Sequence, residues 1–316
     1  MNEYDNNDFM TEGANDKKAC RSGMSGAAAV ISGEAGAAPY GEGLAPIYDA
    51  FIGEDYSYAA YADYIEKIFE LHGKPQDSLI ADLGCGTGSM CLELATRGYD
   101  MIGIDNSPHM LAVAREKTIS QGAPEILFLE QELDSFELYG SVGAFISTID
   151  SLNYITDKRR LRRMFRLVDN YLQPGGLFIF DVNTVYKLSQ EFQNGIFYEI
   201  TDEVCYLWEN SYKRNNKTSI YDLTLFTREQ GGLWRRRDEI HRQRAYMRED
   251  IEAAASDTKL SIVGSYGFLN FKRPLHKAKK VVYVMVKLQT TKQGNNINAM
   301  LMRHKRQNTK QNEVVS

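Results

Sequence analysis

Three alternating glycines follow an aspartate in the segment ADLGCGTG, at residues 81–88. Glycine inside a helix or strand costs about 0.5–1 kcal/mol relative to alanine. Three glycines in so short a segment therefore indicate a tight turn, or a backbone that a ligand approaches closely. The residues of interest in this turn are Asp82, Gly84, Cys85, Gly86 and Gly88.

Three classes of ligand can be compared for this turn. A phosphate-binding loop needs a lysine after its last glycine, whereas Gly88 is followed by Ser89 and Met90. A dinucleotide fingerprint, GxGxxG, would place its third glycine at Ser89, so an NAD-type dehydrogenase is the weaker alternative. S-adenosylmethionine carries a sulfonium, an ammonium, ribose hydroxyls and an adenine, and it favours acidic residues and backbone amides over lysine.

Acidic residues stand where such a ligand would need them. Asp82 precedes the first glycine by two residues, and Asp105 closes the next predicted strand about 20 residues further on. A carboxylate at that second position can accept hydrogen bonds from both ribose hydroxyls. Glu132 follows the third predicted strand, where a side chain can reach the adenine edge.

The elements around these residues alternate between strand and helix, which predicts a parallel sheet covered on both faces. Ser107 and Pro108 form an N-cap and first-turn pair that should open a helix. The predicted strands are 79–83, 101–104, 126–129, 144–147, 177–182, 260–263 and 281–286. The predicted helices are 56–71, one through Met90 and Leu94, 108–117, 158–172 and 248–255.

Residues 195–246 change to strand-like alternation of aromatic and β-branched residues, and we expect an antiparallel insertion on the ligand side of the sheet. Residues 1–40 and 290–316 are polar, with few large apolar groups, and are predicted to be a flexible arm and a flexible basic tail. A single domain should therefore span residues 41–289.

Composition narrows the class of protein further. The 316 residues are 43% hydrophobic, with no apolar run near the roughly 18 residues that a membrane helix needs and no secretory segment. The four cysteines form no CxxC pair and the five histidines no ligand cluster, so we expect reduced thiols and no metal site. These features predict a cytoplasmic protein.

The charge of −5 is unevenly distributed, since residues 258–312 hold twelve Lys or Arg and no Asp or Glu. A solvated flank with a disordered tail explains this stretch more simply than RNA binding, because no aromatic-basic motif accompanies it.

The chain resembles class I S-adenosylmethionine-dependent methyltransferases over about residues 43–287. The resemblance rests on DLGCGTG, GIDNSPHML, FLEQELDSF, TIDSLNYI and LQPGGLFIFDVNT. A narrower resemblance, to a bacterial subgroup of uncharacterised methyltransferases, rests on LAPIYD, WEN and EIHRQRAY. The resemblance to class I methyltransferases implies an α/β fold. The expected architecture is a Rossmann-like seven-stranded methyltransferase sheet with helices on both faces and an antiparallel β insertion after strand five. Two departures are Glu132, where Asp is usual, and Tyr61, where an early tryptophan is common.

The resemblance also implies roles for individual residues. Asp82 and the three glycines would frame the methionine moiety, while Cys85 is expected to be a small packed residue. Asp105 would hold the ribose, and Tyr48 would close over the cofactor. Residues 150–154 would reach the transferred methyl group. The adenine would lie among Asn106, Met110, Gln131 and Glu132.

Methyl transfer from a sulfonium is an in-line displacement, so alignment supplies much of the rate enhancement. A general base is needed only when the acceptor holds its proton at neutral pH, and the candidates are Asp150, His241 and Tyr246. Asp150 could instead cap the turn before Asn153, and His241 could pair with a carboxylate of the insertion.

The acceptor is less constrained by the sequence. Enzymes that methylate base amino groups usually carry a DPPY-like motif where this chain has DSLN, which lowers the weight of that reaction. A small molecule is favoured, RNA is the alternative, and a binding protein without transfer chemistry is a third. Arginines at 235–237, 242 and 244 could neutralise an acidic acceptor, or form a solvated strand face.

Overall fold

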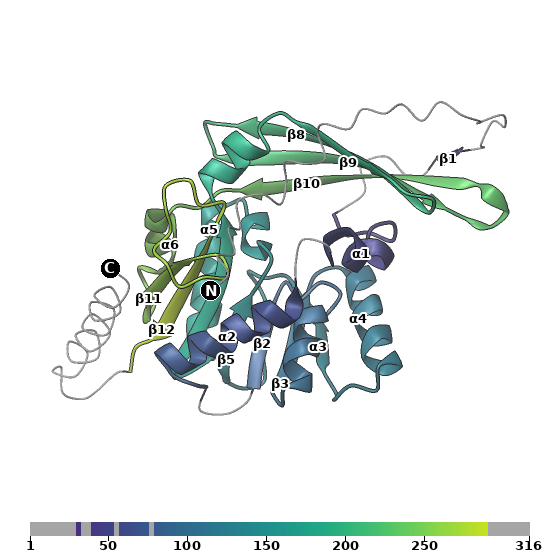
Figure 1. Cartoon of the computed structure of the whole chain (residues 1–316). Helices are drawn as coiled ribbons and strands as arrows, with labels where there is room; N and C mark the ends of the chain where they lie inside the picture. Colours follow the sequence, from purple (N-terminus) through teal and green to yellow (C-terminus); the bar gives the residue numbers. More distant parts are fainter. Residues whose placement is uncertain (1–29, 33–38, 54–56, 76–78, 290–316) are drawn as a thin grey trace, which may run out of the picture.

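The computed structural model describes residues 30–32, 39–53, 57–75 and 79–289, and its centre is a seven-stranded sheet (Figure 1). The strand order is β11-β12-β6-β5-β2-β3-β4. Strands β4, β3, β2, β5 and β6 are parallel, and β12 runs antiparallel to both of its neighbours. The strands are β2 (Leu79–Leu83), β3 (Asp100–Asp105), β4 (Leu127–Glu130), β5 (Val142–Ser147), β6 (Leu172–Asn183), β11 (Leu260–Gly267) and β12 (Lys280–Lys287).

Helices cover both faces of this sheet, as the strand–helix alternation predicts. Strand residues alternate between faces, so Ile80 packs into one hydrophobic cluster and its neighbour Ala81 into the other. The first face carries α2 (Tyr58–His72), α3 (Ser89–Thr96) and α4 (Pro108–Ser120); the second carries α5 (Lys158–Tyr171) and α6 (Arg248–Ala255).

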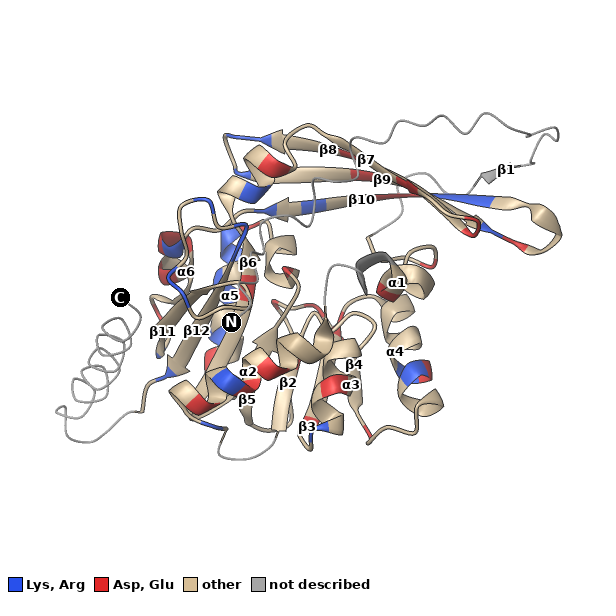
Figure 2. Cartoon of the chain, in the orientation of Figure 1, with Lys and Arg blue, Asp and Glu red and all other residues tan. Residues whose placement is uncertain are grey.

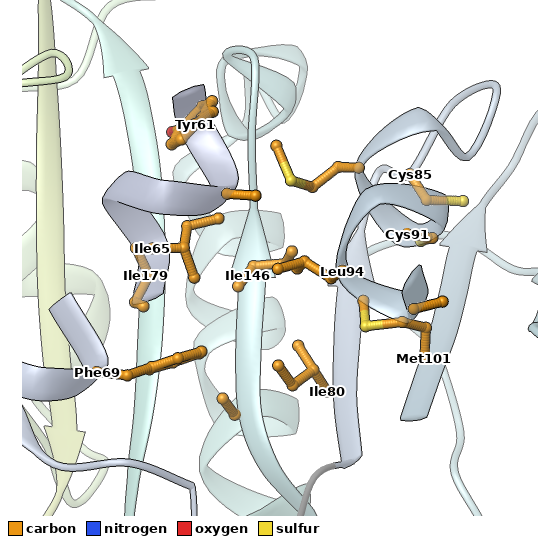
Figure 3. Close-up of a cluster of buried hydrophobic side chains, with 14 of the residues drawn as sticks. Tyr61, Ile65, Phe69, Ile80, Cys85, Cys91, Leu94, Met101, Ile146 and Ile179 are labelled. Carbon is orange, nitrogen blue, oxygen red and sulfur yellow. The ribbon is translucent and has the colours of Figure 1, made fainter. Parts of the chain in front are cut away.

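The first cluster shows how the sheet is held against its helices (Figure 3). Ile65 and Phe69 of α2 and Leu94 of α3 pack against Ile146 and Ile179 of the central strands, and all are fully buried. Burying side chains of this size contributes about 1.5–3 kcal/mol each. This well-packed core fixes the strands and helices relative to one another, and thereby the positions of the loops at the strand ends.

Local sequence signals set the helix starts correctly. The Ser107 side chain accepts a hydrogen bond from the Met110 N–H at 3.1 Å and caps α4, as the Ser–Pro pair predicts. Strand β6 begins earlier than expected, at Leu172, because the PGG segment continues the strand through an irregularity opposite β5 instead of ending in a turn.

A second sheet contains the predicted insertion, in the order β1-β10-β9-β8-β7. Its antiparallel part consists of β7 (Ile196–Ile200), β8 (Val204–Lys213), β9 (Thr218–Arg228) and β10 (Trp234–Arg244). It lies beyond the strand ends at one edge of the main sheet, with arginines along β10 (Figure 2).

The predicted terminal segments fall mostly outside the described residues, which exclude 1–29 and the whole tail at 290–316. Two parts of the predicted arm are described and are ordered into the fold. Val30–Ser32 form β1, which pairs in parallel with the start of β10. Pro39 and Tyr40 line the cavity described below.

Candidate functional site

A cavity of about 750 Å³ lies at the carboxyl ends of the parallel strands, beneath β10. Ligands of open α/β sheets bind at this edge. Its lining includes Tyr48, Gly84, Gly86, Asp105, Asn106, Met110, Glu132, Ser151, Tyr154, Arg160, Arg235, Arg237 and Glu239, together with residues 39–43. Seven of these residues are ones that the sequence predicts for the cofactor: Tyr48, Gly84, Gly86, Asp105, Asn106, Met110 and Glu132.

The glycine turn needs its glycines for two physical reasons. Gly84, Gly86 and Gly88 have φ angles of 78°, 55° and 73°, in the left-handed region that favours glycine. A Cβ atom on Gly84 would lie 2.6 Å from Ser151 Cβ, and one on Gly88 would lie 2.9 Å from Ala114 Cβ. At Gly86 the nearest atom would be 3.9 Å away, on Tyr48. Gly86 therefore presents open backbone to the cavity, whereas Gly84 and Gly88 allow close packing.

Asp105 connects the glycine turn to the start of α4. Its two carboxylate oxygens accept hydrogen bonds from the backbone N–H groups of Gly86 and Ser107, each at 2.9 Å. Burial raises the pKa of Asp105, and these hydrogen bonds oppose that rise. The carboxylate is thus fixed in the cavity wall, where its remaining lone pairs can accept hydroxyl donors.

Asp82 and Cys85 lie in the interior, away from the cavity lining. Asp82 Oδ2 accepts a hydrogen bond from the Cys91 thiol at 3.5 Å, while Oδ1 has no hydrogen-bond partner among the described residues. Cys85 packs in the first core cluster (Figure 3), as expected for a small packed residue. Gly88 is also absent from the lining.

The buried carboxyl of Asp82 predicts a pH effect on stability. Burial, aided by the charge of Asp105, raises the pKa of Asp82 from 3.8 to about 7, despite the opposing Cys91 hydrogen bond. The folded state therefore holds this proton more strongly than the unfolded chain, and the resulting stability is lost as the pH rises through about 7. We expect the free energy of unfolding of the wild type to fall, relative to Asp82→Asn, between pH 5 and 8.

Urea unfolding across that pH range measures this difference. Asp100→Asn, which removes a carboxylate at the exposed start of β3, is the matched control. If the free energy of unfolding depended on pH in the same way in the wild type and in Asp82→Asn, the raised pKa of Asp82 would be contradicted.

Of the four residues expected around the adenine, Asn106, Met110 and Glu132 line the cavity. Asn106 donates to Glu132 Oε1 at 3.1 Å, and Glu132 also pairs with Arg160 at 2.9 Å. Gln131 is not among the lining residues; its side chain bonds instead to the backbone of Glu137. The cavity wall here thus depends on Asn106, Met110 and Glu132.

The turn after β5 has a strained backbone that is stabilised by hydrogen bonds to Asp181. Ile149 and Asp150 both have positive φ angles, of 54° and 53°, and Asp181 accepts hydrogen bonds from both of their backbone N–H groups at 2.8 and 2.7 Å. This conformation costs about 1–3 kcal/mol per residue and persists only where the surroundings impose it. It starts the 3₁₀ helix Ser151–Tyr154, which brings Ser151 and Tyr154 to the cavity.

Asp150 is not among the cavity-lining residues. Its side chain makes no capping hydrogen bond to the turn, so that alternative is wrong. Its carboxylate binds Lys280 and Gln243, each at 2.6 Å. Burial would raise its pKa, but Lys280, with weaker help from Lys187 and Gln243, lowers the pKa of Asp150 to about 2. A carboxylate held this firmly is a poor proton acceptor.

The other two candidate bases differ in their surroundings. Tyr246 is buried, is not among the cavity-lining residues, and donates its hydroxyl proton to the backbone oxygen of Ile155. His241 pairs with Glu239 at 3.1 Å, as the alternative interpretation predicts, and lies 3.0 Å from the Tyr154 hydroxyl. Through Glu239 and Tyr154, His241 is connected to the cavity wall.

The sequence reasoning missed several lining residues. The sequence motifs do not predict Tyr40 or Glu239 as lining residues. Glu239 nevertheless occupies the same alternating face of β10 as Arg235, Arg237 and His241. Strand alternation in 235–241 could have identified that face. Arg242 lies on the opposite face and is exposed, so it does not point into the cleft.

Asp49 links the LAPIYD segment to the glycine turn and to α4. Its carboxylate accepts hydrogen bonds from Thr87 at 2.6 Å and Ser89 at 2.9 Å, and pairs with Lys117 of α4. These bonds hold the adjoining Tyr48 over Gly86.

Within the described ranges, no helix is long and apolar enough to cross a membrane. No group of three or more His, Cys, Asp or Glu side chains in the same ranges is placed to hold a metal ion.

Comparison with known proteins adds independent evidence. A family model described as "Methyltransferase domain" matches residues 80–176. A putative methyltransferase from Geobacillus sp. (strain WCH70) is 30% identical over 78% of this chain and 99% of its own length. A putative methyltransferase from Bacillus subtilis (strain 168) is 32% identical over 67% of this chain and 82% of its own length. The crystal structure of an S-adenosylmethionine-dependent methyltransferase from Clostridium acetobutylicum is 31% identical, covers 78% of this chain and 98% of its own, and has a TM-score of 0.71.

The glycine turn, the carboxylate after β3 and the sheet order agree with these matches. The chain belongs to the class I S-adenosylmethionine-dependent methyltransferases, and S-adenosylmethionine is its cofactor.

Proposed function

We propose that the protein methylates a small molecule that binds beside the cofactor, under β10. One observation carries this proposal: a single cavity extends from the glycine turn at Gly84 and Gly86 to Arg237 and Glu239 of β10. Its volume of about 750 Å³ lies within the roughly 300–1,000 Å³ typical of small-molecule pockets.

The residues at one end of the cavity fit S-adenosylmethionine. The open backbone at Gly86 leaves room for the methionine moiety, and Asp105 offers a fixed carboxylate for the ribose hydroxyls. Asn106, Met110 and Glu132 would surround the adenine. When bound, the cofactor supplies an electrophilic methyl group on a sulfonium; the protein's own contribution is to align the acceptor and exclude water.

The opposite end of the cavity favours a polar acceptor. Arg235 and Arg237 line it and are paired with Glu229 and Glu42, of which Glu42 is largely exposed. Guanidinium groups suit carboxylate or phosphate groups, so an acceptor with an anionic part could replace Glu42 as the partner of Arg237.

A relative from Streptomyces venezuelae supports amino sugars as a class to screen. It is named dTDP-3-amino-3,4,6-trideoxy-alpha-D-glucopyranose N,N-dimethyltransferase and is 26% identical over 136 residues, 43% of this chain and 55% of its own.

RNA is a weaker acceptor on this geometry. Among the described lysines of the basic stretch, Lys280 pairs with Asp150, Lys279 pairs with Glu191, and Lys287 bonds to the carbonyl groups of Asp169 and Leu172. None of these lysines lines the cavity.

Label transfer tests the proposal directly. The protein is incubated with methyl-labelled S-adenosylmethionine and either a protein-free small-molecule extract or total RNA. We expect label in the small-molecule fraction. Label in RNA alone would overturn the choice of acceptor, and label in neither fraction would overturn the transfer function.

Tyr48 should discriminate between cationic and neutral forms of the cofactor. Its ring lies over Gly86, near the space for a sulfonium, and a cation–π contact contributes about 0.5–2 kcal/mol, a factor of about 2 to 30. We expect Tyr48→Leu to weaken S-adenosylmethionine binding more than S-adenosylhomocysteine binding, and Tyr48→Phe to preserve the ratio. Calorimetric titration with both ligands measures this ratio of affinities. Equal losses of affinity for the two ligands in Tyr48→Leu would contradict the cation–π contact.

A further inference from the structure

Four side chains form a hydrogen-bonded chain across the cavity, between the turn after β5 and strand β10. The Tyr40 hydroxyl donates to the Tyr154 oxygen at 2.7 Å, and the Tyr154 oxygen lies 3.0 Å from His241 Nδ1. His241 Nε2 lies 3.1 Å from Glu239 Oε2. The chain thus begins at two cavity-lining hydroxyls and ends at a carboxylate whose side chain is 2% exposed.

The direction of every hydrogen bond in this chain follows from Glu239. Its carboxylate already accepts the backbone N–H groups of Tyr40 at 2.8 Å and Gly41 at 3.1 Å, so it acts as an acceptor towards His241 as well. The proton of the neutral imidazole therefore lies on Nε2, and the bare Nδ1 accepts from the Tyr154 hydroxyl. Both tyrosine hydroxyls then point their protons towards His241.

We propose that this chain takes the proton of the methyl acceptor, which is accordingly an amine or alcohol bound against the Tyr40 and Tyr154 hydroxyls. The inference rests on the small-molecule transfer function proposed above. Tyr154 receives the proton, directly or through Tyr40, and passes its own proton to His241 Nδ1. Glu239 stabilises the imidazolium, as a buried carboxylate does in other proton-accepting triads.

The step balances in atoms and charge. The acceptor nitrogen or oxygen forms the bond to the methyl carbon as the bond between that carbon and sulfur breaks, and the sulfur keeps the electron pair. The proton lost by the acceptor is matched by the proton gained by His241, which returns it to water after product release. Positioned proton transfer of this kind contributes about 10²–10⁴-fold in rate.

A tyrosinate acting alone is a poorer explanation of the same geometry. Burial, with the neighbouring tyrosines and Asp150 adding to it, raises the pKa of Tyr40, and burial also raises the pKa of Tyr154. Both phenols are therefore neutral at ordinary pH. In the relay each phenol that gains a proton also gives one up, so both phenols stay neutral. Among the described residues, ionisable groups that act electrostatically on this region include Tyr48 of α1 (Tyr48–Gly53), Asp150, Tyr221 of β9 and Lys280 of β12.

The tautomer of His241 can be measured without an acceptor. Long-range ¹H–¹⁵N correlation spectra of the labelled full-length protein, compared with those of His241→Gln, assign the ring nitrogens. We expect protonated Nε2 and bare Nδ1 at pH 8, and loss of this preference in Glu239→Gln. A proton on Nδ1 in the wild type would overturn the relay, because Tyr154 could not then donate to it.

Transfer of label supplies the functional test. With methyl-labelled S-adenosylmethionine and a protein-free small-molecule extract, we expect Tyr154→Phe and His241→Gln to lower the rate by about 10²–10⁴-fold. Their affinity for S-adenosylhomocysteine should change less than about threefold, or 0.6 kcal/mol. The control is Arg242→Gln, on the exposed opposite face of β10, which should match the wild type.

The pH profile separates proton removal from a structural role. If the relay removes the proton, the dependence of the rate on pH should differ between the wild type and His241→Gln, whereas a loss of structure would lower the rate equally at every pH. Wild-type rates in both variants between about pH 6 and 9 would overturn the relay. If the wild type transfers no label, the proposed function fails, and the tautomer measurement alone decides whether the chain is poised as described.

Discussion

Replacing Asp105 by alanine should weaken S-adenosylhomocysteine binding at least tenfold, or about 1.4 kcal/mol. The carboxylate is held in place before any ligand arrives, because Gly86 and Ser107 donate their backbone N–H groups to its two oxygens. Hydroxyl donors can therefore bind a preorganised acceptor with little ordering cost. Calorimetric titration of the wild type and the variant measures the loss.

Two controls make the Asp105 result specific. Asp100→Ala removes an exposed carboxylate at the other end of the same strand, and its affinity should equal that of the wild type. Titration with NADH should give no binding in any of the three proteins. An unchanged affinity in Asp105→Ala would show that the ribose lies elsewhere.

Replacing Gly84 by alanine should destabilise the protein by about 2 kcal/mol or more. A left-handed backbone costs a non-glycine residue about 1–2 kcal/mol, and the new methyl group would lie 2.6 Å from Ser151 Cβ. The melting temperature should fall by about 4 °C or more. Gly86→Ala carries the backbone cost alone, since its methyl group would have 3.9 Å of clearance, so its melting temperature should fall less.

A double-mutant cycle with Ser151→Gly isolates the steric part of this effect. Removing the Ser151 side chain eliminates the overlap, so Gly84→Ala should cost less in the Ser151→Gly background than in the wild type. Scanning calorimetry of the four proteins measures the coupling. Strict additivity would show that backbone strain, and not the contact with Ser151, dominates.

The features that could be predicted from the sequence are those set by neighbours along the chain. The glycine turn, the acid that ends β3 and the Ser–Pro start of α4 each depend on residues within a few positions, and their placement agrees with the expectation. The strand alternation of residues 195–246 likewise predicted the second sheet, because period-two patterning is a local property.

The features that could not be predicted depend on contacts between distant segments. Glu239 binds the backbone of Tyr40 from 199 positions away, and Lys280 takes the side chain of Asp150 from 130 positions away. Asp82 matches the binding motif, yet it is fully buried beside Cys91, because burial depends on how the helices pack over the sheet. Which of several acidic residues faces a ligand is therefore decided by tertiary structure.

Tyr40, which lines the cavity, is hydrogen-bonded on both of its sides. The Ser107 hydroxyl donates to the Tyr40 carbonyl at 2.7 Å on the α4 side, while Glu239 holds the Tyr40 N–H on the β10 side. Tyr40 is therefore held by the two layers that enclose the cavity, and any displacement of this segment during a catalytic cycle must break hydrogen bonds to both layers.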